Sequence, residues 1–505
     1  MSTDDKTPLF DFHYSSSNLN ESAGSTLNVT QNSVYRIGSI SKLFTAYIFL
    51  VNYGWEHWDK PVTNYLPELR GSAGHSKTTK DVVDSVDWGE VTIGALASHL
   101  SGIGRDYSNG DLASQNFLWK QAGFPKLSSK DIPDCAGNSS LPPCSRKEYF
   151  EGFTQRHPVF SPYSTPIYSN AAYRLLGYVL ERLSGKPYHD LIETSVLRSL
   201  DLNHSGTKRP TAIKVPVIPN GDSGWFQDVG DEAPTAGLYS SSLDIARFGQ
   251  AILRNHQLPP TVTRRWMKPT SHTASLRLSI GSPWEIWRPR SNITRGRVID
   301  MYTKSGSIGH YNSLLVLIPD FQVTFSILTA GPTSNAAIRV ATELVGRSLL
   351  PALEKISGIQ AGESLCGIYT STAKNKNSSI SIGVDEDGLL VERWINRGVD
   401  VSKIAQGLVE DGELQSIRFQ VTNLHSSVSS HGQNTSRVSY RAFYMTTSNT
   451  NNFHILDYAA EEWSGVDSLN YGNIAIDDFV FTLDKDGRAI ELEARVLRES
   501  FKREE

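Results

Sequence analysis

The hydrophobic periodicity of the 505-residue chain changes near residue 360, and this change limits its possible folds more than any other feature. Before that point, four segments space their apolar residues as amphipathic helices do: 40–51, 170–183, 243–253 and 334–356. Three more are typical of strands: 301–304, 312–318 and 322–329. After it we find two-residue alternation, as in 379–395 and 479–496. The pattern predicts an α/β domain over 1–358 and a β-rich domain over 363–505, a meander or small barrel.

Local residue types predict further elements. Residues 10–14 alternate like a strand, and we expect 34–37 to be the antiparallel partner. The segment 56–165 combines short helical pieces with many Pro and Gly residues, which predicts a helical insert with long loops. We expect Gly185 to end the second helix and 357–358 to end the last one.

Composition and charge exclude several classes of partner. Lys and Arg number 49 against 53 Asp and Glu, a net charge of −4 without a basic stripe, so we expect no nucleic-acid partner. The most apolar stretch, 43–51, is too short to span a bilayer, so we expect no membrane partner. The chain has no His-Glu-x-x-His, paired Cys-x-x-Cys or phosphate-binding glycine loop, so we expect no metal and no cofactor. A small-molecule substrate remains, and the oligomeric state stays open.

Three cysteines and seven glycosylation sequons bear on the compartment. Cys135 and Cys144 lie in a loop rich in turn formers, and we expect a disulfide there rather than two free thiols. Cys366 is left as a free thiol or one whose partner is missing. With the disulfide, the sequons favour a secreted glycoprotein; they are Asn20, Asn28, Asn138, Asn203, Asn292, Asn377 and Asn434. The polar start at 2–6 is no signal peptide and favours the alternative, a cytoplasmic protein.

The first chemical motif is the Ser-x-x-Lys spacing of Ser39 and Lys42, at the start of the first amphipathic helix. Residues three apart on a helix face the same way, so Lys42 can hydrogen-bond the Ser39 hydroxyl and, when neutral, take its proton. Burial and a second cation would lower the pKa of the lysine and make it a usable base. The helix N-terminus also favours negative charge that develops at Ser39. The spacing recurs at 371–374, so the motif alone is weak.

The second motif is Tyr168-Ser169-Asn170, which enters the 170–183 helix. A tyrosine near two cations becomes phenolate-like and can shuttle protons. Asn170 can hold a substrate amide and orient Lys42. Tyr-x-Asn also occurs at 107–109 and 471–473, but only Tyr168 directly opens a strongly apolar helix.

The third motif is Lys304-Ser305-Gly306-Ser307, on one of the predicted strands. Small residues at a strand edge let the backbone lie beside a substrate, so we expect residues 305–307 to bind it. The N–H groups of Ser307 and Ser39 can form an oxyanion hole. Lys304 would supply the second cation near the tyrosine.

Together the three motifs resemble those of the serine β-lactamase and penicillin-binding-protein superfamily, in the Tyr-x-Asn form of the class C enzymes. The flanking segments 35–39, 92–102 and 236–245 agree, and the resemblance covers about residues 9–355. It implies an antiparallel sheet flanked by helices, with a helical subdomain. The β-rich remainder resembles the C-terminal, barrel-like domain of fungal secreted β-lactamase-like proteins.

The resemblance also implies roles for four residues: Ser39 as the acylated nucleophile, Lys42 as its base, Tyr168 as proton shuttle and deacylation base, and Lys304 as electrostatic partner. His310 stands where many β-lactamases have Gly. A side chain of that size should narrow the site, which argues against broad antibiotic turnover. We expect His310 to be either a pocket wall or a surface residue, and His99 to be a buried structural histidine rather than a ligand.

The start of the chain departs from the family pattern. A helix usually precedes the first strand in this family, but only about eight residues precede Phe10 here. The chain is therefore either a trimmed form or a naturally short one. In either case, we expect the 334–356 helix to lack a neighbour and Cys366 to lack a disulfide partner.

The leading functional hypothesis is a serine hydrolase of fungal secondary metabolism that cleaves an ester, amide or lactone through an acyl-enzyme at Ser39. The closest alternative is an acyltransferase or thioesterase-like enzyme, in which a substrate alcohol or amine replaces water. A third is an isomerase or cyclase that uses Tyr168 and Lys42 for acid–base chemistry without acylation. A fourth is a catalytically silent binding protein, against which the three intact motifs count. Substrate identity stays open because a fold does not fix function.

Overall fold

The computed structural model describes residues 7–70, 81–114, 122–137, 141–210, 215–289, 297–373, 377–405, 413–430, 433–446 and 465–504. Its contacts divide the chain into two compact units. The first consists of Met1–Arg290 and Val298–Arg347, and the second of Ser291–Arg297 and Ser348–Glu505. Each unit has a hydrophobic core of its own, so the two are described separately.

The first unit is built on an antiparallel sheet with the strand order β3-β4-β5-β6-β7-β8. Its strands are β3 (Ser271–His272), β4 (Leu278–Ile280), β5 (Glu285–Trp287), β6 (Met301–Ile308), β7 (Tyr311–Ile318) and β8 (Val323–Ala330). The last three confirm the strands expected from the sequence. A two-residue turn joins β6 to β7, and Gly309 in this turn takes φ +54°, a conformation that glycine adopts readily.

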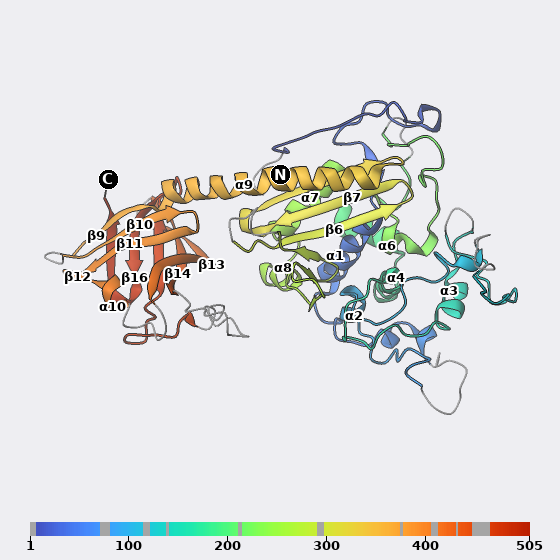
Figure 1. Ribbon diagram of the computed structural model, residues 1–505, viewed down its shortest axis with the longest axis horizontal. Helices are drawn as coiled ribbons and strands as arrows, with labels where there is room; N and C mark the ends of the chain where they lie inside the picture. Colours follow the sequence, from blue (N-terminus) through green and yellow to red (C-terminus); the bar gives the residue numbers. More distant parts are fainter. Residues whose placement is uncertain are drawn as a thin grey trace. The chain divides into compact units, whose positions relative to one another are not determined.

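Helices pack against this sheet and against one another, and they supply most of the buried residues of the first core. They are α1 (Ser41–Tyr53), α2 (Ile93–Ala97), α3 (Arg146–Phe153), α4 (Asn170–Ser184), α5 (Tyr188–Ile192), α6 (Ala233–Ala236), α7 (Ser242–Leu253) and α8 (Pro260–Trp266). Helix α1 packs against α4 and α6, and α7 packs on β7 and β8. Figure 1 shows the sheet in yellow with the blue helix α1 beside it. The expected helices at 40–51, 170–183 and 243–253 are confirmed, and Gly185 ends α4 as predicted.

The expected strand at 10–14 is wrong. Phe10, Phe12 and Tyr14 are 78%, 71% and 75% exposed, so their alternation does not mark the buried face of a sheet. The expected partner does form a strand, β1 (Val34–Arg36), but it pairs with β2 (Tyr239–Ser241). The sequence favoured a local pairing, whereas the strand's neighbour comes from a distant part of the chain.

The second unit is a closed antiparallel β-barrel. Among the described residues, the order β10-β9-β17-β16-β15-β14-β13-β11 closes because β10 also pairs with β11, and β12 adds to β11. The strands are β9 (Gly367–Ser371), β10 (Ser379–Asp385), β11 (Gly388–Asn396), β12 (Val399–Asp400), β13 (Leu414–Ser430), β14 (Gln433–Thr446), β15 (Asp478–Leu483), β16 (Ala489–Ala494) and β17 (Glu499–Arg503), with the short helix α10 (Val401–Ala405). Phe479, Phe481, Leu492 and Phe501 are fully buried inside it. The expected barrel-like domain is therefore confirmed.

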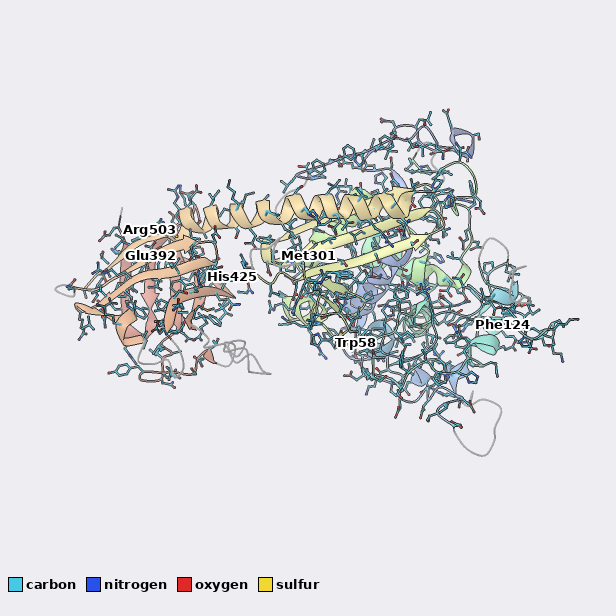
Figure 2. The ribbon with its side chains drawn as sticks, viewed as in Figure 1. Trp58, Phe124, Met301, Glu392, His425 and Arg503 are labelled. Atoms are coloured by element: carbon cyan, nitrogen blue, oxygen red, sulfur yellow. A yellow bond between two sulfur atoms is a disulfide. The ribbon has the colours of Figure 1, made fainter. Side chains whose placement is uncertain are left out.

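Helix α9 (Ser334–Leu365) is longer than the sequence predicts, because residues 357–358 do not end it. One glycine inside a helix costs only about 1 kcal/mol relative to alanine, so Gly358 is tolerated. The helix stops where β9 begins. There Arg503, labelled in Figure 2, donates to the carbonyl oxygen of Cys366 at 2.5 Å and ties the last strand to the end of the helix.

The cysteines follow the sequence expectation. Cys135 and Cys144 form a disulfide and are both buried. The thiol of Cys366 is free, and burial raises its pKa. Two of the sequons, at Asn138 and Asn292, lie outside the described residues. No helix in the described part of the chain has the length and apolar character needed to cross a membrane.

Strand β6 and the turn before α1 touch backbone to backbone. A β-carbon on Gly306 would lie 2.9 Å from the Ser39 nitrogen and would overlap the carbonyl oxygen of Ile37. A β-carbon on Gly38 would lie 2.6 Å from the nitrogen of Ser307. These two glycines therefore allow the strand to approach Ser39 closely.

We predict that Gly306→Ala destabilises the first unit by about 1–3 kcal/mol, because the added methyl group has no room. Gly346→Ala is the matched control: a β-carbon there meets nothing within 4 Å, and alanine is the better helix former. The control should be neutral or slightly stabilising. Denaturant unfolding followed by circular dichroism measures both, and equal stability of the two variants would contradict the close contact.

Candidate active site

Ser39 lies at the junction between a short 3-10 turn, η2 (Gly38–Ile40), and helix α1. Its neighbours in the turn are buried, whereas Ser39 itself is partly exposed. Lys42 follows in the first turn of α1, and its Nζ lies 3.0 Å from Ser39 Oγ. The predicted contact between residues three apart is therefore present.

Lys42 is fully buried, and its Nζ has three oxygen neighbours. Besides Ser39 Oγ, they are Asn170 Oδ1 at 2.7 Å and the carbonyl oxygen of Thr235 at 3.0 Å. The two carbonyl-type oxygens only accept, so they engage two N–H bonds and leave the third position facing Ser39. Burial lowers the pKa of Lys42. In the neutral amine, the third position is a lone pair that can accept the serine proton.

The hydroxyl of Tyr168 lies 2.6 Å from Ser39 Oγ. Tyr168 precedes α4, whose N-terminus is capped by the side chain of Ser169. Lys42 Nζ and Lys304 Nζ lie 4.9 Å and 5.4 Å from the centre of the Tyr168 ring. Burial raises the pKa of Tyr168, but the two lysine charges and the hydrogen bonds lower it more, so this phenol is more acidic than an ordinary tyrosine.

Lys304 comes from β6 and is 1% exposed. Its Nζ lies 2.5 Å from Glu285 Oε1, in a salt bridge between β6 and β5. Burial lowers the pKa of Lys304, but Glu285 and Tyr168 raise it more, so Lys304 stays cationic. Sequence reasoning missed Glu285, because no local pattern links it to a lysine 19 residues away.

Strand β6 has an open edge in the described sheet beyond Thr303, where its pairing with β5 ends. Because a two-residue turn joins β6 to β7, the N–H groups of Ser305 and Ser307 point away from β7. The nitrogen of Ser307 adjoins the turn that carries Ser39. An oxyanion hole needs two such N–H groups on one side of the nucleophile, and this role of Ser39 and Ser307 stays a prediction.

Two further side chains flank the Tyr168 ring. His99 stacks on it with the ring centres 4.7 Å apart, and its Nδ1 accepts from the Ser169 N–H at 3.1 Å. Burial and the nearby cations lower the pKa of His99 well below its usual value, so the imidazole is neutral. Arg105 Cζ lies 4.9 Å from the ring centre, a third cation that sequence reasoning missed. His99 is buried, as expected, and holds the tyrosine in place.

Asp106 is hydrogen-bonded to Asn170 and is another residue that sequence reasoning missed. Asn170 Nδ2 donates to Asp106 Oδ2 at 3.2 Å, while Oδ1 of the same amide accepts from Lys42. A donor on one side and an acceptor on the other fix the orientation of this amide. Burial raises the pKa of Asp106 to about 6. Asn170 therefore orients Lys42, as the sequence predicted, and Asp106 orients Asn170.

The structure thus brings five predicted residues into one cluster: Ser39, Lys42, Tyr168, Asn170 and Lys304. The other predicted binding residues, 305–307, lie along the adjoining β6 edge. His310 lies in the turn after β6. Its N–H donates to the carbonyl oxygen of Ser223, and its own carbonyl oxygen accepts from the N–H of Gly331. Within the described ranges, no cluster of His, Cys, Asp or Glu is arranged to hold a metal ion.

The second Ser-x-x-Lys spacing lies in the barrel. Ser371 is the last residue of β9, and its hydroxyl donates to Glu499. Lys374 lies outside the described residues. This serine therefore shares no unit with the tyrosine and lysines of the cluster.

Comparison with known proteins decides the family of this chain. A family model described as Beta-lactamase matches residues 12–348, which include every member of the cluster. The chain belongs to the β-lactamase family. A second model, described as "Beta-lactamase-like-like, C-terminal domain", matches residues 358–505, the region of the barrel. The resemblance inferred from the three motifs is therefore confirmed.

Fungal proteins are among the similar sequences. A beta-lactamase-like protein of Arthroderma benhamiae is 30% identical, and the match covers 97% of this chain and 84% of that protein. A probable hydrolase of Phoma sp. is 26% identical over 80% of this chain and 67% of its own length. Among solved structures, the octameric penicillin-binding protein homologue from Pyrococcus abyssi aligns with a TM-score of 0.45 and 18% identity, over 94% of this chain and 89% of that one. Within its family, the chain is thus similar to fungal proteins named probable hydrolases.

We predict that Asp106→Asn changes how stability depends on pH. The aspartate pKa rises from its usual 3.8 to about 6 on folding, so the folded protein keeps a proton that the unfolded chain releases. The contribution of this protonated carboxyl to the free energy of unfolding is complete below about pH 3.8 and is lost as the pH rises through about 6. Asparagine is neutral throughout. As the pH rises from about 4 to about 8, the free energy of unfolding of the variant should therefore increase relative to that of wild type by roughly 1–3 kcal/mol.

Thermal melts of both proteins across this pH range measure the difference. Other carboxylates affect both proteins alike, so the difference isolates Asp106. A difference that stays constant from acid to alkaline pH would contradict the raised pKa.

Proposed function

We propose that this protein is a serine hydrolase that forms an acyl-enzyme at Ser39 and cleaves an ester, amide or lactone. One observation carries the proposal: Ser39 Oγ lies 2.6 Å from Tyr168 Oη and 3.0 Å from Lys42 Nζ. A serine hydroxyl is a weak nucleophile until a neighbouring base takes its proton. Here both flanking groups have pKa values below those of an ordinary lysine and tyrosine. Fungal relatives named probable hydrolases add support.

In the acylation step, Ser39 Oγ attacks the carbonyl carbon of the substrate, and its proton passes to the Tyr168–Lys42 pair. The carbonyl oxygen gains negative charge, which the N–H groups of Ser39 and Ser307 would stabilise. The pair then gives the proton to the leaving oxygen or nitrogen. An alcohol or amine departs, and an ester remains on Ser39.

In the deacylation step, water attacks this ester. Ser39 Oγ no longer carries a proton, so the base must be a neighbour, and Tyr168 Oη is 2.6 Å away. Tyr168 takes a proton from the water and then returns it to Ser39 Oγ as the acid is released. Lys304 favours the ionised form of Tyr168 throughout, because Glu285 keeps this lysine charged.

We predict that a fluorophosphonate probe labels wild type once and fails to label Ser39→Ala, as measured by intact mass. Ser371→Ala is the matched control, because Ser371 heads the same four-residue spacing but lies in the barrel, bonded to Glu499. The control should be labelled like wild type. The reason is that Ser39 has Lys42 and Tyr168 beside its hydroxyl, both with lowered pKa values, whereas the Ser371 hydroxyl is bonded to the carboxylate of Glu499.

Two outcomes would contradict the proposal of an acyl-enzyme at Ser39: no adduct on wild type, or an equal adduct on Ser39→Ala. Turnover that survives in Ser39→Ala but is lost in Tyr168→Phe would favour an isomerase or cyclase instead. Product analysis with and without an added alcohol then separates hydrolysis from acyl transfer, since a transferase would give the new ester.

A further inference from the structure

A carboxylate stands where the open edge of β6 begins. Glu285 is the first residue of β5 and pairs in register with Thr303, so its side chain marks the end of β5–β6 pairing. Its Oε1 accepts from Lys304 Nζ at 2.5 Å and from Ser305 Oγ at 3.0 Å. Its Oε2 accepts from the Ser305 N–H at 3.1 Å. An ammonium, a hydroxyl and a backbone N–H that converge in this way bind a carboxylate, and the chain supplies its own.

The salt bridge exposes its negative side. The Lys304 side chain is 1% exposed and the Glu285 side chain is 22% exposed. The ammonium is therefore covered, whereas the Glu285 side chain stays partly exposed, and its carboxylate keeps one of about four lone-pair positions beyond the three donors. A substrate that extends from Ser39 along β6 meets this carboxylate before it can reach Lys304.

We propose that Glu285 sets the substrate class of this site. The part of the substrate that reaches the Ser305 end of β6 is cationic or a neutral hydrogen-bond donor, and substrates with a carboxylate there are rejected. A carboxylate would be repelled by Glu285 and would have to displace it from three donors at once. An ammonium or N–H group instead bonds to the remaining acceptor position of the carboxylate. This inference rests on the proposed hydrolase function and deepens it.

The test compares esters that differ only in charge. One series places the charge on the leaving group: 3-carboxyphenyl acetate, phenyl acetate and 3-(trimethylammonio)phenyl acetate. A second places it on the acyl group, as 4-nitrophenyl esters of succinate, butyrate and 4-(trimethylammonio)butyrate. Each kcat/KM is divided by the rate constant for alkaline hydrolysis of the same ester, which removes intrinsic reactivity. Low ionic strength limits screening.

In one of the two series, we expect wild type to prefer the cationic over the anionic ester by about tenfold or more. Glu285→Gln, which keeps the shape of the side chain but not its charge, should reduce this preference by about tenfold. The readout is the ratio of the two esters, because loss of the partner of Lys304 changes the turnover of both esters alike. Asp300→Asn is the matched control. It neutralises a carboxylate that is paired with Arg288 next to the same strands, so it should leave the preference unchanged.

The wild-type preference needs no variant, so it tests the inference even where Glu285→Gln folds poorly. Turnover of both series with no charge preference in wild type, or with the same preference in Glu285→Gln, would overturn the inference and leave the hydrolase intact. An enzyme that turns over none of the six esters and forms no adduct at Ser39 would contradict the proposed function, and the inference would fall with it.

Discussion

The site depends on two buried lysines beside one tyrosine, each with a different kind of partner. Lys42 contacts neutral groups, the side-chain oxygen of Asn170 and the carbonyl oxygen of Thr235, so burial of its charge is only partly compensated and its pKa falls. Lys304 contacts the carboxylate of Glu285, and its pKa rises. Neighbouring groups whose environments shift their pKa values apart are a mark of acid–base chemistry. One lysine can exchange protons, while the other supplies a permanent charge.

The rest of the first unit holds these groups in place. Gly38 and Gly306 let β6 lie directly against the turn that carries Ser39, which brings Lys304 to the same tyrosine as Lys42. Asn170 is the first residue of α4, which packs against α1, and its side chain holds Lys42 in position. Lys42, Asn170 and Lys304 lie on helices and a strand, Ser39 lies in the turn before α1, and Tyr168 directly precedes α4. Little of the geometry therefore has to form when a substrate binds.

Local patterns predicted most of this site from the sequence. The spacing of Ser39 and Lys42 is a property of one helical turn, and Tyr168 and Lys304 were recognised by the helix that follows the tyrosine and the strand that carries the lysine. Glu285 and Asp106 were missed because their contacts come from the tertiary fold and leave no local signal. The same reason explains the wrong strand at 10–14, since the neighbour of β1 is a distant segment. The predicted helix end at 357–358 failed because a single glycine is too small a penalty to stop α9.

The ionisation of Tyr168 tests the effect of the two lysines on this tyrosine most directly. The protein can be labelled with tyrosine carrying ¹³C at the ring carbon that bears the hydroxyl, and the Tyr168 resonance can be assigned by its loss in Tyr168→Phe. Titration followed by NMR then gives the midpoint for this residue. We predict a midpoint below the value of about 10 found for an ordinary tyrosine, because Lys42 and Lys304 stabilise the phenolate. A midpoint at or above about 10 would contradict it, because burial would then outweigh the two lysines.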